Sequence, residues 1–282
     1  MLTQRIITTL VVLPVLLAAV WFETPVHWFT LLMVAWGAVA VIEFYRLSRA
    51  RGIAPLLYFG TVWTLLFVSV RDASVAAYFN MEAEKVSMML LVSAIVLPLM
   101  WLLRREPRGQ AFSSWVWTLG GMAYIGILLG NFVALRTTAD GRNWVYFAFL
   151  ATFASDTAAF FVGRAWGRRR LAPSISPSKT WEGAIGGIAG AAVISLVFVP
   201  STLFSAANAL HIPALSYWSA VLLGIVVSVF GQIGDLVESL LKRNMDAKDS
   251  GKLFPGHGGA LDRLDSVAFA GVVIYYFVWL TR

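Results

Sequence analysis

Long apolar segments separated by short polar stretches dominate the chain. A helix needs about 20 mostly apolar residues to cross a bilayer, so runs of about 18 or more nearly uncharged residues are interpreted as membrane spans. Nine spans are predicted, with approximate bounds Ile6–Phe22, Trp28–Tyr45, Pro55–Val70, Val86–Leu103, Trp115–Leu135, Trp144–Val162, Ala184–Phe204, Tyr217–Leu241 and Ser266–Leu280. The pattern therefore predicts an all-α fold, a polytopic membrane bundle of about nine helices.

These spans are expected to form a single membrane domain over residues 1–282. Residues 1–143 are expected to supply scaffold and lipid-facing spans. Residues 144–282 are expected to supply the catalytic spans and loops, because the charged, motif-like stretches concentrate there.

The first apolar segment has two interpretations. Arg5 followed by an apolar run is also typical of a secretory signal peptide. The run is long for a signal sequence, and Glu23, Thr24 and Pro25 follow it without a clear small-residue cleavage site. We therefore expect a retained membrane span.

Basic residues are shared unevenly between the loops. If nine spans alternate in direction, 17 of the 22 Lys and Arg residues fall on one side of the membrane. They lie at Arg5, in the 46–51 and 104–108 loops, and in the 164–179 and 242–263 loops. Because Lys and Arg concentrate on the cytoplasmic side, the N-terminus is predicted to be cytoplasmic and the C-terminus to lie on the opposite side. Both motif-like loops then face the cytoplasm.

The composition limits the available chemistry. The chain has no cysteine and only three histidines, which excludes a thiolate site and disfavours a histidine-rich zinc or iron site. A metal would be held mainly by carboxylate oxygens, the ligands that magnesium and manganese prefer. The net charge of +7 lies in short loops beside the spans, which fits anionic lipid head groups better than nucleic acid.

The most polar stretch is residues 239–266. It contains five Lys or Arg and four Asp residues, in a chain of which only 13% is charged. Its Pro-Gly-His-Gly-Gly segment at 255–259 cannot continue a helix, and glycines allow backbone N–H groups to turn together toward an anion. This stretch predicts phosphate and metal chemistry at a membrane face.

Carboxylates occur at helical spacing around that stretch. Asp235 and Glu238 share one helix face, and Asp262 and Asp265 share another. Two helix ends presenting carboxylates toward each other would form a divalent-metal site able to clamp phosphoryl oxygens. Salt bridges with the neighbouring Lys and Arg residues are the alternative, but they do not account for the adjoining glycine-rich turn.

A second polar stretch, residues 155–183, follows the sixth span. Asp156 lies inside that span, where a charged group usually faces a polar cavity, although pairing with an arginine between helices is the alternative. Pro173 and Pro177 prevent a helix and display Lys179, a point charge suited to phosphate, beside hydroxyl groups. Thr180 has two open roles, binding phosphate or capping the next helix.

These two stretches resemble the phosphatidate cytidylyltransferase family, also called CDP-diacylglycerol synthases. The family's C-terminal signature is Ser-x-x-Lys-Arg, four residues, Lys-Asp, then Pro-x-His-Gly-Gly, two residues and Asp-Arg-x-Asp. It is matched by Ser239, Lys242, Arg243, Lys248, Asp249, Pro255, His257, Gly258, Gly259, Asp262, Arg263 and Asp265. The Ser-Asp-Thr-Ala-Ala run at 155–159 and the Ser-Pro-x-Lys-Thr-Trp-Glu-Gly run at 176–183 are similar to the family's segments as well.

The match is specific from about Asp156 to Ser266, whereas the first five spans match only in character. Two departures from the family pattern are visible. Ala260 replaces a larger aliphatic residue, and Ser178 stands where a second lysine is common. The second departure removes one phosphate contact and makes Lys179 more critical.

The resemblance implies that CTP and phosphatidate give CDP-diacylglycerol and pyrophosphate, by direct attack of the lipid phosphate on the α-phosphorus of CTP. It implies bound Mg²⁺, with a second, monovalent cation such as K⁺ as an option. The expected partners are CTP, phosphatidate and membrane lipids, without nucleic acid, and a homodimer is left open. The expected location is the bacterial cytoplasmic (inner) membrane, with the active site on the cytoplasmic side.

The resemblance also implies roles for individual residues. The expected metal ligands are Asp235, Asp262 and Asp265. These three residues, with Lys242 and His257, form the expected catalytic set. The expected substrate-binding residues are Asp156, Arg164, Ser176, Lys179, Thr180, Ser239, Arg243, Lys248, Asp249, Gly258, Gly259 and Arg263.

Two other functions compete with this interpretation. A CTP-dependent lipid-alcohol kinase would use a similar magnesium–triphosphate site but transfer the γ-phosphoryl group, so its products distinguish it. A cation or phosphate transporter would use Asp156 and Asp235 to line a pathway through the membrane. The concentration of charge on one face and the lack of an internal repeat argue against transport.

Overall fold

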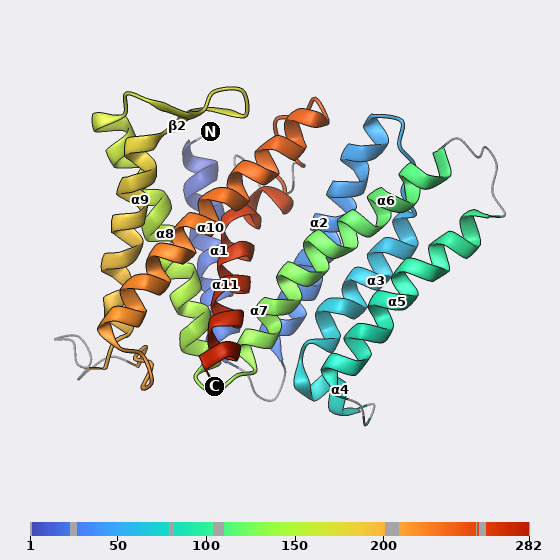
Figure 1. Cartoon of the computed structure of the whole chain (residues 1–282), viewed down its shortest axis with the longest axis horizontal. Coiled ribbons are helices and arrows are strands. Elements are labelled where there is room, and N and C mark those ends of the chain that lie inside the picture. Colours follow the sequence, from blue (N-terminus) through green and yellow to red (C-terminus); the bar gives the residue numbers. More distant parts are fainter. Residues whose placement is uncertain are drawn as a thin grey trace. The chain divides into compact units, whose positions relative to one another are not determined.

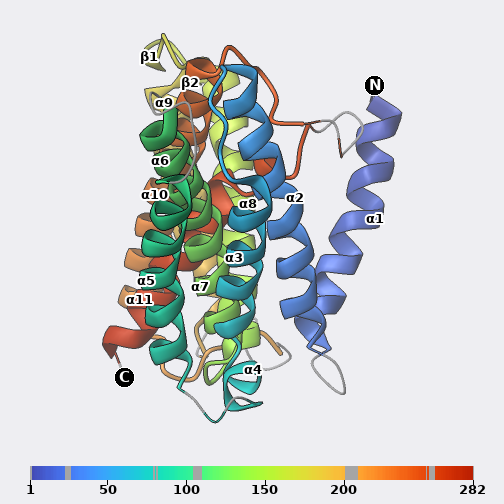
Figure 2. The same cartoon turned by 90° about the vertical axis from the view of Figure 1, so that its right-hand side faces the viewer.

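A computed structural model of the chain describes residues 2–22, 27–78, 80, 82–103, 110–200, 209–251, 253 and 258–281 (Figures 1 and 2). The chain is mostly helical. Its first half contains α1 (Leu2–Trp21), α2 (Trp28–Ala50), α3 (Leu57–Val70), α4 (Ala73–Tyr78), α5 (Ala83–Leu102), α6 (Ala111–Gly121), the π-helix η2 (Met122–Ile127) and α7 (Leu128–Arg136). Its second half contains α8 (Gly141–Trp166), β1 (Arg170–Ala172), β2 (Ser176–Thr180), α9 (Trp181–Ser195), η3 (Leu196–Phe198), α10 (Tyr217–Asn244), η5 (Leu261–Arg263) and α11 (Asp265–Thr281).

A helix lies at each of the nine predicted positions. Among the described residues, six helical segments are long and apolar enough to cross a membrane: α2, α5, α6 through α7, α8, α9 with η3, and α10. The apolar helices Val12–Trp21, Leu57–Val70 and Asp265–Thr281 are shorter. The chain is therefore a multi-pass helical membrane protein, while nine crossings and the sides of the two termini stay predictions.

The helices form two compact units. Unit 1 comprises Met1–Thr137 and Asn244–Arg263, and unit 2 comprises Thr138–Arg243 and Leu264–Arg282. The polar stretch 239–266 is thus divided, because its middle part groups with the N-terminal helices and its two ends group with α10 and α11.

Unit 1 is built around α2 and α3, which pack against each other (Figure 2). Both helices also pack against η2. Tyr45 of α2 is fully buried, and its hydroxyl donates to the carbonyl oxygen of Thr118 at 2.8 Å. A Cβ atom on Gly60 or Gly121 would lie 2.1 or 2.5 Å from the Tyr45 side chain. These two glycines therefore let α3 and α6 approach the tyrosine ring.

Unit 2 is organised by the close contact of α8 and α9 (Figure 1). A Cβ atom on Gly186 would lie 2.6 Å from Val162, and one on Gly190 would lie 2.6 Å from Ala158. Small residues four apart allow helix backbones to approach closely in a membrane, where van der Waals packing replaces the hydrophobic effect as the driving force. Helix α11 also packs on α8.

A short hairpin connects α8 to α9. Strands β1 and β2 are antiparallel, with Arg170 opposite Thr180 and Ala172 opposite Ser176. The all-α prediction therefore misses a small two-stranded sheet, although it places Pro173 and Pro177 correctly outside any helix. The two prolines exclude helix, and the turn between them lets the chain pair with itself.

Candidate active site

A cavity of about 550 Å³ lies in unit 2, beneath the hairpin and between helices α8, α9 and α10. Its volume is within the range of pockets that hold small-molecule ligands, about 300–1,000 Å³. Its polar and charged lining residues are Asp156, Arg164, Arg170, Ser178, Lys179, Thr180, Gln232 and Asp235. Phe160 adds an aromatic ring, and Ala159, Gly163, Gly183 and Ala184 add small surfaces.

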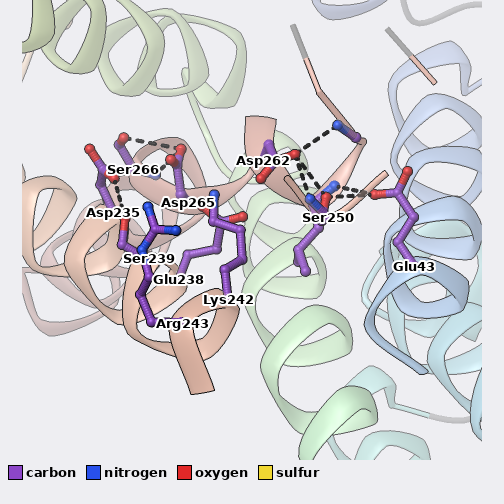
Figure 3. Close-up of polar contacts among 12 residues, drawn as sticks. Glu43, Asp235, Glu238, Ser239, Lys242, Arg243, Ser250, Asp262, Asp265 and Ser266 are labelled. Atoms are coloured by element: carbon purple, nitrogen blue, oxygen red, sulfur yellow. Dashed lines mark hydrogen bonds and ion pairs between the residues drawn. The ribbon is translucent and has the colours of Figure 1, made fainter. Parts of the chain in front are cut away.

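The cavity carries charges of both signs. Lys179 Nζ forms an ion pair with Asp235 Oδ2, and both side chains remain partly accessible, at 24% and 30%. The hydroxyl of Ser239 donates to Asp235 Oδ1 at 3.4 Å (Figure 3). With Arg164 and Arg170, three cations face two carboxylates. This net positive lining suits a polyanion, and the carboxylates suit a cation bound with it.

The hairpin is held in place by the first turn of α9. The Glu182 carboxylate accepts hydrogen bonds from the backbone N–H groups of Arg168 and Arg169, at 3.0 and 3.2 Å. The Thr180 hydroxyl accepts from the N–H of Gly183 at 3.2 Å, so Thr180 caps the helix while also lining the cavity. Of its two predicted roles, helix capping is thus confirmed.

The strand end is also tied to α10. Arg243 Nε donates to the carbonyl oxygen of Ile175 at 3.4 Å, next to the predicted substrate-binding residue Ser176. Ser176 is half-buried in β2 and is not among the residues that line the cavity. Arg243 therefore contacts the hairpin backbone, and a phosphate contact by this side chain stays a prediction.

A second polar cluster lies in unit 1 around Asp262. Asp262 Oδ2 accepts from the N–H of Ser250 at 2.9 Å, from the Ser250 hydroxyl at 3.0 Å and from the N–H of Gly259 at 2.8 Å. Glu43 of α2 completes the cluster: its Oε2 atom accepts from the N–H of Leu261 at 3.0 Å and lies 3.0 Å from the Ser250 hydroxyl, whose single hydrogen it shares with Asp262 (Figure 3). Both carboxylates are nearly buried, at 8% and 5% exposure.

The glycine pair of the signature makes room for these carboxylates. Gly258 has φ +85°, a conformation that favours glycine, and a Cβ atom there would lie 2.5 Å from Asp262 Oδ2. A Cβ atom on Gly259 would lie 2.3 Å from Glu43 Oε2. The expected turn of N–H groups toward an anion is therefore present at Gly259, but the anion is the chain's own Asp262.

The end of α10 and the start of α11 carry further predicted residues. Lys242 Nζ lies 3.1 Å from Oε2 of Glu238, a fully buried glutamate one turn earlier. Asp265 Oδ1 accepts from the N–H of Ser266 at 2.7 Å and from its hydroxyl at 3.2 Å (Figure 3). This local bonding fixes the carboxylate of Asp265 at the first turn of α11.

The structure brings some of the predicted residues together. Asp156, Arg164, Lys179, Thr180 and Asp235 share the cavity of unit 2. Asp265 also belongs to unit 2, whereas Asp262 belongs to unit 1. Within the described part of the chain, no three Asp, Glu or His residues gather as a metal-binding group.

The remaining predicted residues lie elsewhere. The side chains of Lys248, Asp249 and Arg263 are exposed on unit 1. His257 lies outside the described residues, so its predicted role stays a prediction.

Sequence reasoning missed several residues of these clusters. Glu43 had a signal, because an acidic residue in an apolar span usually has a functional or structural partner. Arg170 is not among the predicted site residues, but it lines the cavity. Gln232 and Ser250 carried no signal beyond being polar.

The fold and the cavity define a class: a multi-pass membrane protein with a cationic, carboxylate-containing cavity suited to phosphorylated ligands. A model of the cytidylyltransferase family matches residues 3–281, nearly the whole chain. The chain belongs to this family.

Curated relatives extend over most of the chain. It is 36% identical over 255 residues to a phosphatidate cytidylyltransferase of Bacillus subtilis, covering 89% of each chain. It is 35% identical over 281 residues to a phosphatidate cytidylyltransferase of Brucella suis, covering 98% of this chain and 93% of the relative. A phosphatidate cytidylyltransferase of Staphylococcus haemolyticus is 41% identical over 159 residues, covering 56% of this chain and 57% of the relative.

Proposed function

We propose that the protein transfers the cytidylyl group of CTP to phosphatidate, giving CDP-diacylglycerol and pyrophosphate. The observation that carries the proposal is the unit 2 cavity, where Arg164, Arg170 and Lys179 meet Asp156 and Asp235. Cations of this kind bind the oxygens of a triphosphate, and the relatives, which are phosphatidate cytidylyltransferases, suggest the reaction class. The product is a precursor in phospholipid biosynthesis.

The reaction needs no covalent enzyme intermediate. An oxygen of the lipid phosphate attacks the α-phosphorus of CTP and forms a new P–O bond. The bond from the α-phosphorus to the oxygen that bridges it to the β-phosphorus breaks, and pyrophosphate leaves with the electron pair. The chain's task is then to align two anions and reduce their repulsion, which positioned cations do effectively in a site that excludes water.

Lys179 is the residue best placed for this task. Its ammonium group is paired with Asp235, and 24% of its side chain is accessible. A triphosphate offers a stronger counter-charge than one carboxylate, so Lys179 can turn to the phosphates without leaving a buried charge unpaired. Arg164 and Arg170 add two further cations.

Magnesium is part of the proposal. Asp156 and Asp235 line the same cavity, and magnesium is commonly held by one or two carboxylates together with substrate phosphates and water, so the donor set fits. When bound, the ion would neutralise charge on the phosphoryl oxygens. Contributions from Asp262 and Asp265, and from a monovalent cation such as K⁺, belong to the same proposal and are tested by substitution and by ion dependence.

We place the site at the cytoplasmic face of the membrane. The support is the distribution of Lys and Arg, 17 of which fall on one side under alternating spans. Phosphatidate keeps its acyl chains in the bilayer with its phosphate at the interface, and CTP arrives from the cytosol. A cavity at the cytoplasmic ends of membrane helices therefore admits both substrates.

The test uses protein purified in mild detergent with phosphatidate, Mg²⁺ and CTP labelled in the cytidine. The proposal predicts label in the organic phase with one pyrophosphate per lipid, and loss of both in Asp235→Asn. Asp140→Asn is the matched control, because Asp140 is exposed, belongs to unit 2 and makes no side-chain cap hydrogen bond. Label that stays aqueous as CDP while a lipid alcohol gains phosphate would replace the proposal with the kinase.

A further inference from the structure

Gln232 occupies an unusual position on α10. It lies three residues before Asp235 and lines the same cavity, one helical turn away along the same face. It is a neutral amide in a cavity whose other hydrogen-bonding side chains are mostly charged. A neutral amide adds no positive charge for binding a triphosphate.

The orientation of the Gln232 amide is fixed by its partners. Nε2 donates to the carbonyl oxygen of Ala184 at 3.2 Å and to the hydroxyl oxygen of Ser228 at 3.0 Å. A carbonyl oxygen can only accept, so the nitrogen and not the oxygen must face Ala184. Both amide hydrogens are used by these two bonds.

The surroundings hold the amide in this orientation. The Ser228 hydroxyl lies 2.7 Å from the hydroxyl of Ser155 on α8, which ties three helices together at this level. On α9, a Cβ atom at Gly187 would lie 3.1 Å from Gln232 Nε2, so the glycine leaves space for the amide. The neighbouring groups therefore hold the side chain in one orientation.

The carbonyl oxygen of Gln232 is the group left to act on a ligand. Among the described residues no donor is hydrogen-bonded to Oε1, and this atom is not one of the fully buried polar atoms that lack a partner. Because Oε1 has no partner there yet is not fully buried, and the Gln232 side chain lines the cavity, Oε1 is the acceptor that this side chain can offer to a ligand. Phe160, on the α8 wall of the cavity, offers an aromatic face of the kind on which bases stack.

We propose that Gln232 determines base specificity, by accepting a hydrogen bond from the exocyclic amine of cytosine through Oε1. The inference rests on the proposed function, because it takes CTP to be the ligand of this cavity. Uracil presents a carbonyl oxygen where cytosine has the amine, so it would place two acceptors face to face. The fixed amide cannot turn to offer its nitrogen without breaking its bond to Ala184.

The test compares kcat/KM for CTP, UTP and dCTP in wild type and in Gln232→Leu. The variant is expected to lose about 10- to 200-fold with CTP and to change little with UTP, so the CTP/UTP ratio falls at least tenfold. The value for dCTP should fall in parallel with that for CTP. Gln110→Leu is the matched control, because Gln110 is an exposed glutamine of unit 1 that makes no side-chain cap hydrogen bond.

Ser228→Ala provides a second, milder variant. It removes one of the two acceptors that orient the amide but keeps Oε1, so the CTP/UTP ratio should fall by less than in Gln232→Leu. This variant keeps the inference testable if Gln232→Leu does not fold.

Three outcomes would overturn the assignment. Equal losses with CTP and UTP would show that Gln232 only supports the fold, and no loss with either nucleotide would show that Gln232 does not contact the substrate. A change in the CTP/dCTP ratio alone would show that Oε1 binds the ribose hydroxyl instead. If wild type transfers no cytidylyl group to phosphatidate, the proposed function fails, whereas active wild type with an unchanged ratio refutes the Gln232 assignment alone.

Discussion

Glu43 offers a direct test of how the loop that carries Ser250 and Asp262 is held. It lies on α2 and accepts two hydrogen bonds at 3.0 Å, from the Ser250 hydroxyl and the Leu261 N–H, with only 5% of the residue exposed. A hydrogen bond to a charged acceptor contributes about 1.5–3 kcal/mol, and one to a neutral acceptor about 0.5–1.5 kcal/mol. Glu43→Gln keeps the shape and can keep both bonds, but it removes the charge from the acceptor.

The expected loss follows from those two bonds. Weakening each by about 1 kcal/mol lowers the free energy of unfolding by about 2 kcal/mol in Glu43→Gln. Glu43→Ala leaves the Leu261 N–H without its acceptor and opens a cavity, so a loss of about 4 kcal/mol is expected. Because the single hydrogen of the Ser250 hydroxyl can go to Asp262 instead, the hydroxyl keeps one partner in both variants, and about 2 kcal/mol is the upper limit for Glu43→Gln.

The assay is thermal unfolding in mild detergent, followed by tryptophan fluorescence, together with turnover. A loss of about 2 kcal/mol corresponds to a fall in Tm of about 4–8 °C, and turnover should fall about tenfold as the loop that carries Asp262 loses a restraint. Glu84→Gln is the control, since Glu84 is an exposed glutamate in the first turn of α5. If Glu43→Gln unfolded at the same temperature as Glu84→Gln, the argument that a charged acceptor holds this loop would be refuted.

Three further predictions concern the cavity, the signature and the helix packing. Lys179→Ala should lower kcat/KM about 100-fold, and Lys179→Arg should be less impaired, because the positive charge itself contributes to catalysis. Equal activities of the two variants would contradict this. Asp262→Asn should remain folded, because the amide oxygen can still accept hydrogen bonds from Ser250 and Gly259. Its turnover should nevertheless fall about 100-fold. Turnover like that of wild type would remove Asp262 from the catalytic set. Gly190→Leu should lower the free energy of unfolding by about 2 kcal/mol, since a Cβ atom there would already lie 2.6 Å from Ala158. Ala189→Leu, on the exposed face of the same helix, should not lower it. A denaturant titration in detergent measures both values.

The sequence was sufficient to predict the helices and part of the cavity. Apolar runs report span positions directly, because a bilayer-crossing helix must be apolar along its length. Asp156 and Asp235 were predictable as site residues, since charged residues inside apolar spans seldom occur without a partner, and together with Lys179 they do line one cavity.

Other features depend on partners that local patterns do not report. Glu43 and Ser250 are 207 residues apart in the chain, so no periodicity connects them. Gln232 is significant only because Ala184 and Ser228 fix its amide, which is a matter of geometry between helices. The hairpin was hidden for a related reason: strands of three and five residues, with Pro173 between them and Pro177 inside the second, are too short to show an alternating pattern.

The fate of the two ends of the triphosphate tests the central claim most directly. Purified protein would be given phosphatidate and Mg²⁺ with CTP radiolabelled either at the α-phosphate or at the γ-phosphate. Cytidylyl transfer predicts that the α-label enters the lipid fraction and the γ-label is recovered as pyrophosphate in equal amount. Recovery of the γ-label in the lipid, with the α-label left in aqueous CDP, would contradict the account.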